Sequence, residues 1–188
     1  MYNYQSKTSM QKDKKERVLI VSDLWGKEKS NWINFYLSVL EDQFDVQYYD
    51  SCVLGEIDTS EYAKDKLHAQ FINGGIDKAV ENLLLQENEN CMVLGFSIGG
   101  CIAWKAANLG LKVESLIAVS STRLRYEIKK PAVKIKLIYG QEDANKPDGN
   151  WFSNMQISAN FYQNEDHELY RKKECADKIC KTIIDHKF

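Results

Sequence analysis

A serine stands between glycines in the stretch Gly95-Phe96-Ser97-Ile98-Gly99, which satisfies the pattern G-x-S-x-G. The stretch lies between a predicted strand and a predicted helix, and the glycines would allow a turn tight enough to expose the serine hydroxyl. A serine hydroxyl attacks well only when a base takes its proton and donors hold the negative charge that develops. The pattern therefore predicts a nucleophilic Ser97, with the backbone N–H of Ile98 as one donor. A closely packed turn or a phosphate cradle is the alternative, but neither G-x-x-x-x-G-K-[ST] nor G-x-G-x-x-G is present.

The base must come from three histidines, His68, His167 and His186. His167 follows the last predicted strand, so it is expected on the same edge of the sheet as Ser97. His68 lies upstream of the serine, before a predicted helix, and His186 is two residues from the C-terminus. The topology favours His167 as the base.

The base needs a carboxylate that fixes its tautomer and stabilises its protonated form. Glu142 and Asp143 both follow the predicted strand 133–140. Asp143 is preferred because its shorter side chain loses less freedom when it is held, and Glu142 remains open as an alternative.

Short apolar runs rich in β-branched residues alternate with segments of helical periodicity, which indicates a doubly wound α/β fold with a mostly parallel sheet. The helical segments are expected on both faces of the sheet, and the interval around Gly55 is expected to be a polar loop. We predict a frayed tail over residues 1–16 and one domain over 17–188. The six expected strands cover 17–22, 44–50, 91–96, 115–121, 133–140 and 156–163.

Charge and composition narrow the class of partner. The chain has 188 residues, with 25 Lys and Arg against 27 Asp and Glu, so its net charge of −2 gives no reason to expect nucleic acid or an anionic membrane. No apolar run reaches the length of a secretory signal core or a membrane span, which favours a cytoplasmic protein. Five cysteines without a C-x-x-C pair indicate free thiols rather than disulfides or a zinc site.

The order Ser97, Asp143, His167 resembles the Ser…Asp/Glu…His order of the α/β-hydrolase superfamily, and the likeness runs from Arg17 onward. The resemblance implies that the first expected strand is the family's third, so that the first two strands and a cap domain are lacking. It also implies that "SDLWG" is the loop with the second oxyanion donor, which assigns that role to Leu24, with Trp25 as second choice. "DLWG" is most similar to dienelactone-hydrolase-like members, although these commonly use cysteine as the nucleophile.

These residues predict hydrolysis of a small ester or thioester through an acyl-enzyme, at a shallow, open site that needs neither cofactor nor metal. Trp25, Trp151 and Phe152 are expected on loops at the active edge, where they could line an apolar substrate pocket. The alternative is a non-catalytic binding or interaction module built on a hydrolase fold. The natural acyl substrate and the oligomeric state are left open.

Overall fold

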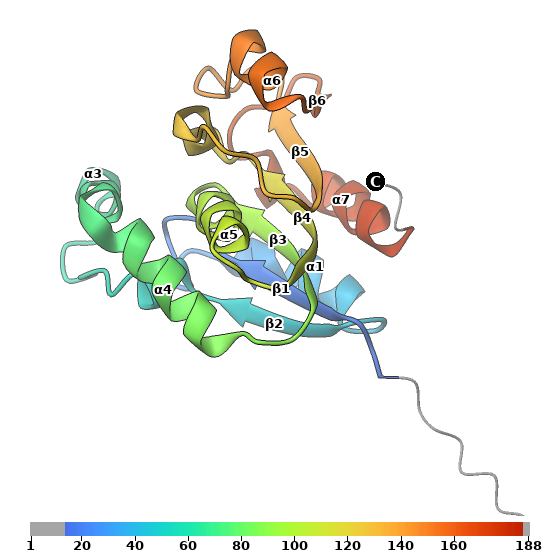
Figure 1. Cartoon of the computed structure of the whole chain (residues 1–188), viewed down its shortest axis with the longest axis horizontal. Coiled ribbons are helices and arrows are strands. Elements are labelled where there is room, and N and C mark those ends of the chain that lie inside the picture. Colours follow the sequence, from blue (N-terminus) through green and yellow to red (C-terminus); the bar gives the residue numbers. More distant parts are fainter. Residues whose placement is uncertain (1–13, 186–188) are drawn as a thin grey trace, which may run out of the picture.

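The computed structural model describes residues 14–185, which fold around one sheet of six parallel strands in the order β2-β1-β3-β4-β5-β6 (Figure 1). Every neighbouring pair runs parallel, so the carboxyl ends of all six strands meet at one edge of the sheet. The strands are β1 (Arg17–Val21), β2 (Asp45–Tyr49), β3 (Cys91–Phe96), β4 (Val113–Val119), β5 (Lys134–Gly140) and β6 (Ala159–Tyr162).

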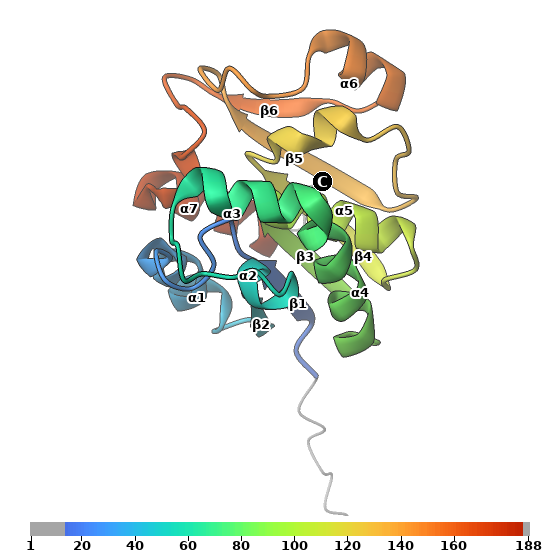
Figure 2. The same cartoon turned by 90° about the vertical axis from the view of Figure 1, so that its left-hand side faces the viewer.

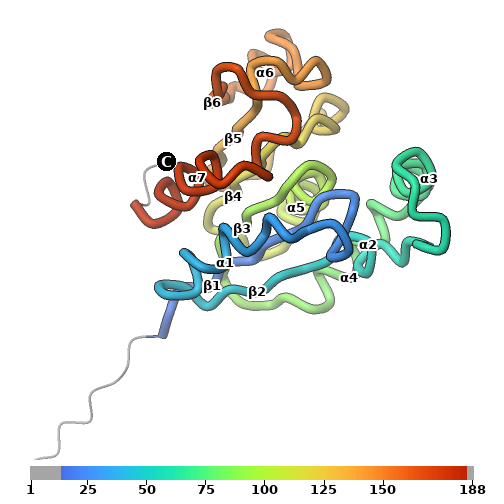
Figure 3. Tube along the Cα trace, turned by 180° about the vertical axis from the view of Figure 1, so that it is seen from behind, coloured from blue at the N-terminus to red at the C-terminus, as the bar shows by residue number. Residues whose placement is uncertain are grey.

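Helices cover both faces of the sheet because each strand sends alternate side chains to opposite sides. In β1, Leu19 and Val21 pack with one core cluster, while Val18 and Ile20 pack with the other. The first cluster is covered by α4 (Ile76–Gln86) and α5 (Ile98–Asn108), and the second by α1 (Asn34–Leu40) and α7 (Lys173–Ile184). Figure 3 shows α1 and α7 in front of the sheet. The predicted six-stranded, doubly wound fold is confirmed.

The direction in which successive strands are added across the sheet reverses after β2. From β1 it first moves outward to the edge strand β2, then returns to place β3 on the other side of β1 and continues to β6. Loops after β1 and β3 therefore diverge and leave a crevice at their carboxyl ends, where open α/β sheets bind ligands. Ser97 follows β3 directly, so it lies at this crevice.

Two parts of the chain differ from the sequence prediction. The interval after β2, expected to be a polar loop, contains α2 (Ser51–Leu54), α3 (Lys64–Gln70) and the short π-helical segment η2 (Phe71–Gly75) ahead of α4 (Figure 2). The interval before β6 contains α6 (Gly149–Met155), and β6 is shorter than the predicted 156–163. The short helices went unnoticed because each is too brief to display a full apolar stripe.

The predicted frayed tail, 1–16, falls mostly on residues 1–13, which lie outside the described residues, as does His186. Glu16 is held by the sheet, because its carbonyl accepts a hydrogen bond of 2.9 Å from the N–H of Asp45. Within 14–185 no helix is both long enough and apolar enough to span a bilayer. All five cysteines are buried free thiols, as their spacing predicted.

Candidate active site

Ser97 occupies a strained turn between β3 and α5. Its φ of +50° and ψ of −113° are sparsely populated by non-glycine residues, and such strain persists only where the surroundings enforce it. The Ser97 N–H donates to the carbonyl of Val119 at 2.8 Å, which continues the pairing of β3 with β4 up to the serine itself. Helix α5 begins at the next residue, Ile98, so its amino end and partial positive charge lie beside the hydroxyl.

Two glycines permit this turn by leaving room for backbone. A Cβ atom on Gly95 would come within 2.5 Å of the Gly100 Cα, which belongs to the first turn of α5. A Cβ atom on Gly99 would overlap the carbonyl oxygens of Val21 and Ser22 at the end of β1. The close approach at Gly99 thus brings the start of α5 against the β1 loop that carries Leu24.

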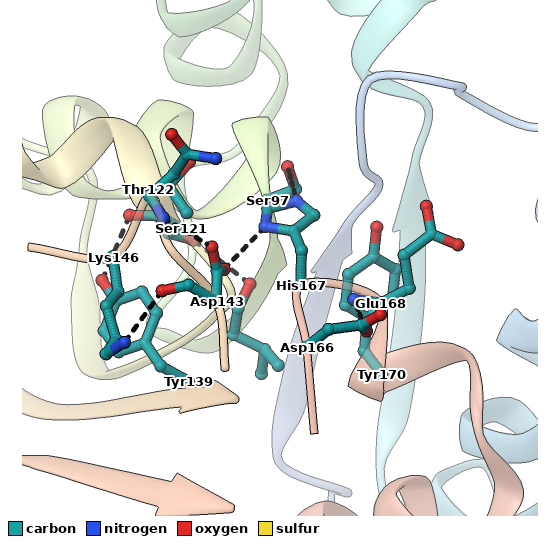
Figure 4. A network of polar contacts seen from close by, with 12 residues as sticks. Ser97, Ser121, Thr122, Tyr139, Asp143, Lys146, Asp166, His167, Glu168 and Tyr170 are labelled. Carbon is teal, nitrogen blue, oxygen red and sulfur yellow. Dashed lines mark hydrogen bonds and ion pairs between the residues drawn. The ribbon is translucent and has the colours of Figure 1, made fainter. Parts of the chain in front are cut away.

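Loops after β5 and β6 carry Asp143 and His167, and backbone hydrogen bonds tie these loops together. The N–H of Gln141 donates to Tyr162 at 2.9 Å, and the N–H of Glu142 donates to Glu165 at 2.9 Å. The two side chains therefore approach each other on a rigid base although 24 positions separate them. Figure 4 shows the His167 ring between Asp143 and Ser97.

The three side chains form a continuous relay. His167 Nε2 lies 3.1 Å from Ser97 Oγ, and His167 Nδ1 lies 2.8 Å from Asp143 Oδ2. An ionised carboxylate only accepts hydrogen bonds, so the network assigns the ring proton to Nδ1 and leaves Nε2 to accept the Ser97 hydroxyl proton. This arrangement can deprotonate Ser97 and hold the resulting imidazolium.

Asp143 is buried, with 3% of its surface exposed, whereas Glu142 is exposed. Burial alone would raise the pKa of Asp143, but hydrogen bonds from His167 and from the Asn145 N–H, with the nearby Lys146 ammonium, lower it below its ordinary value. The carboxylate form is therefore held beside His167. Asp143, not Glu142, makes the contact that the sequence left open.

Leu24, in the loop after β1, and Ile98, the first residue of α5, line the same cavity as Ser97. The Trp25 N–H is used within its own loop, since it donates to Asp23 Oδ1 at 3.0 Å. The Leu24 N–H has no acceptor among residues 14–185. Of the two candidate donors, the Trp25 N–H is therefore used within its loop, whereas the Leu24 N–H is not.

A buried carboxylate fixes that loop. Asp23 is fully buried, and its Oδ2 accepts hydrogen bonds from Tyr170 Oη at 3.0 Å and from Arg171 Nη2 at 2.9 Å. Burial raises the pKa of Asp23, against the opposing effect of Arg171. The contact joins the Leu24 loop to the segment after His167, across 148 positions in sequence. Sequence reasoning missed it because no local pattern pairs residues so far apart.

The cavity beside Ser97 has a volume of about 330 Å³. Helix α3 and the 3₁₀ turn η3 (Thr122–Tyr126) contribute lining residues to this cavity. The residues from η3 could have been found, because they follow the carboxyl end of β4 as Ser97 follows β3. The lining residues that sequence reasoning missed are all polar or charged: Lys64, Asp65, His68, Thr122, Arg123, Arg125, Asn145 and Glu168.

The predicted aromatic pocket residues lie elsewhere. Trp151 is buried in α6, where its Nε1 donates to Glu127 and its ring lies 6.0 Å from that of Trp104. Phe152 packs against the same core. Trp25 stacks beside Tyr62, with ring centroids 5.5 Å apart, in a neighbouring hollow. The prediction that Trp25, Trp151 and Phe152 line the Ser97 pocket is wrong, because the short helix α6 and the Tyr62 contact turn them into packing residues.

Metal ligands are not gathered in the part of the chain that the structure describes: residues 14–185 hold no group of three or more His, Cys, Asp or Glu side chains placed to bind an ion.

Comparisons by sequence found no match, either to a family model or to a curated protein. Solved structures match by fold. A protein from Xanthomonas campestris pv. campestris, assigned to the alpha/beta superfamily of hydrolases, is similar with a TM-score of 0.67 and 13% identity, over 92% of this chain and 99% of its own. Dienelactone hydrolase from Anabaena variabilis gives a TM-score of 0.65 and 15% identity, over 93% and 86% of the two chains.

Mouse alpha/beta hydrolase domain-containing protein 10 gives a TM-score of 0.63 and 12% identity, over 90% of this chain and 88% of its own. At such identities the likeness concerns the fold, and the six-stranded parallel sheet agrees with it. The chain therefore has the α/β-hydrolase fold that the order of Ser97, Asp143 and His167 predicted.

Proposed function

We propose that this protein is a serine hydrolase that cleaves a small ester or thioester through an acyl-enzyme. The observation that carries the proposal is the relay itself, in which the strained Ser97 lies 3.1 Å from His167 Nε2 and Asp143 lies 2.8 Å from Nδ1. The structural neighbours named as hydrolases support the same class of reaction.

In the first half-reaction Ser97 Oγ bonds to the acyl carbon while its proton passes to His167 Nε2. The N–H groups of Ile98 and Leu24 hold the oxyanion of the tetrahedral intermediate. The intermediate collapses as the bond to the alcohol or thiol breaks, and that leaving group takes the proton from His167. Asp143 keeps the imidazole oriented and stabilises its protonated form.

In the second half-reaction a water molecule takes the place of the leaving group. His167 accepts a proton from the water as its oxygen bonds to the acyl carbon, and the bond to Ser97 breaks. Ser97 recovers its proton from His167, and the carboxylic acid departs. A cavity of about 330 Å³ suits a small acyl substrate. We propose that the protein is cytoplasmic, because its five cysteines are free thiols rather than disulfides.

Hydrolysis of p-nitrophenyl acetate by the wild type and by Ser97→Ala tests the proposal. We expect saturable turnover that Ser97→Ala reduces by about 10⁴-fold or more, since the variant lacks the nucleophile. Ser153→Ala, on the exposed part of α6, is a matched control that should retain turnover. Equal turnover by the wild type and Ser97→Ala would contradict the proposal and favour a non-catalytic binding module.

A further inference from the structure

The cavity beside Ser97 has a cationic wall formed by Arg123 and Arg125 of η3 and Lys64 of α3. We propose that this wall selects an ester that also carries a carboxylate, so that the site prefers half-esters of small dicarboxylic acids or similar anionic esters. The inference rests on the proposed function, because it concerns the substrate of the same site.

Arg123 has no anionic partner among residues 14–185. Its Nε is buried and has no hydrogen-bond acceptor among residues 14–185, and within that range its guanidinium forms no ion pair. The group lies 5.1 Å from the Tyr126 ring centroid, which holds it in place without neutralising it. Because Arg123 lines the cavity and has no anionic partner of its own among residues 14–185, its charge is available to a ligand with anionic oxygens.

Arg125 is oriented but keeps its full charge. Its Nη1 donates to the carbonyls of Thr122 at 2.8 Å and of Asn145 at 3.0 Å. These neutral acceptors anchor the side chain between η3 and the loop of Asp143. Arg125 therefore presents a fixed positive charge at the cavity on a scaffold shared with the relay.

The carboxylates of Asp65 and Glu168 also line the cavity, but they do not neutralise the positive charge of the wall. Glu168 is already paired with Arg171 Nη1 at 3.2 Å, and Arg171 does not line the cavity. Asp65 remains against three cations, Lys64, Arg123 and Arg125. The excess positive charge faces a cavity of about 330 Å³ that also contains Ser97, so an anionic group could bind the wall while an acyl carbon reaches the serine.

His68, which also lines the cavity, responds to the same charges. Its pKa is lowered first by burial and then by the positive charges of Arg123, Lys64 and Arg125, while Asp65 acts in the opposite direction. A bound carboxylate would offset those cations and raise the pKa of His68. The pKa of His68 should therefore reveal whether an anion is bound at the wall.

The direct test compares monoethyl glutarate with its neutral counterpart, in which a carboxamide of the same size replaces the free carboxylate. We expect kcat/KM for the anionic ester to exceed that for the amide by about tenfold or more, as for charge-assisted hydrogen bonds. The preference should shrink as salt is added, because the attraction is screened. The rate of hydrolysis of each ester is measured in a pH-stat from the proton that the newly formed carboxylic acid releases.

Arg123→Met removes one charge at nearly constant size, and we expect it to lower the ratio of the two kcat/KM values about tenfold. Lys66→Met is the matched control, since Lys66 is on the same helix as Lys64 but pairs with Glu61 at 3.6 Å outside the cavity. It should leave the ratio unchanged. NMR titration of His68 in the wild type, with and without glutarate, needs no variant and should show a higher pKa with glutarate.

Equal kcat/KM for the two esters in the wild type, or an unshifted His68 titration in glutarate, would overturn this inference even if p-nitrophenyl acetate is hydrolysed. So would an equal loss for both esters in Arg123→Met, which would indicate a purely structural residue. If no ester is hydrolysed in a manner that depends on Ser97, the proposed function itself fails. The assays thus separate failure of the inference from failure of the function.

Discussion

Replacing Arg171 with methionine should weaken the link between the Leu24 loop and the His167 segment. Arg171 Nη2 lies 2.9 Å from Asp23 Oδ2, and the Asp23 side chain is fully buried. The variant keeps the apolar stem of residue 171, but among residues 14–185 it leaves the carboxylate with only the Tyr170 hydroxyl and the Trp25 N–H as donors.

The magnitude follows from that burial. Removing one partner of a buried ion pair costs about 3–5 kcal/mol, because the other charge is left unpaired in a poorly solvated place. The Arg171 side chain is 24% exposed, so water can replace part of its effect. We expect the free energy of unfolding to fall by about 2–3 kcal/mol at neutral pH.

The loss should depend on pH. Burial already raises the pKa of Asp23 in the fold, and removal of Arg171 raises it further. A carboxyl whose pKa is higher in the folded than in the unfolded state stabilises the fold at low pH, and loses that effect as pH rises through the folded value. The gap in stability between wild type and variant should therefore be larger at about pH 7 than at about pH 4.

Urea unfolding followed by tryptophan fluorescence measures both quantities. Lys172→Met is the matched control, since Lys172 is the next residue and pairs with Glu165 at 2.6 Å, with 56% of its side chain exposed. Its unfolding midpoint should stay close to that of the wild type. A loss in Arg171→Met no greater than in Lys172→Met, or one that shrinks as pH rises, would show that Arg171 does not stabilise the buried Asp23 carboxylate.

Three further predictions concern the relay and its turn. His167→Ala should reduce p-nitrophenyl acetate turnover about 10⁴-fold and His68→Ala by far less, whereas the reverse order would identify His68 as the base. Gly99→Ala should cost about 3 kcal/mol in urea unfolding, because its methyl group would overlap strand backbone, and wild-type stability would contradict that geometry. The stability advantage of wild type over Asp143→Asn should be present at neutral pH and disappear as pH falls below the ordinary carboxyl range, because the fold lowers the pKa of Asp143. An advantage that grows on acidification would contradict the carboxylate's role.

The relay could be predicted because its residues follow a topological rule. Side chains just after the carboxyl ends of parallel strands meet at one edge, and Ser97, Asp143 and His167 each follow such a strand. The same rule applied to β4 would have found Arg123 and Arg125. The strands themselves were recognisable from continuous apolar runs, as in β3, where all six residues are buried.

Other parts of the site depend on contacts that no local pattern encodes. Helix α3 buries only Leu67, so it has no apolar stripe to reveal it, yet it supplies Lys64 and His68 to the cavity. Trp151 was wrongly predicted to line the pocket because aromatic residues suit pockets and cores equally well. Its burial follows from α6, which the sequence did not predict. Asp23 and Arg171 are 148 positions apart in the sequence, so they meet only once the sheet has formed.

Covalent labelling with a fluorophosphonate, followed by peptide mapping, tests most directly whether Ser97 is a nucleophile. We expect that one probe molecule attaches to Ser97, that Ser97→Ala takes up none, and that His167→Ala reacts far more slowly because its serine lacks a base. A wild-type protein that stays unlabelled, or that is labelled at a residue other than Ser97, would contradict this expectation.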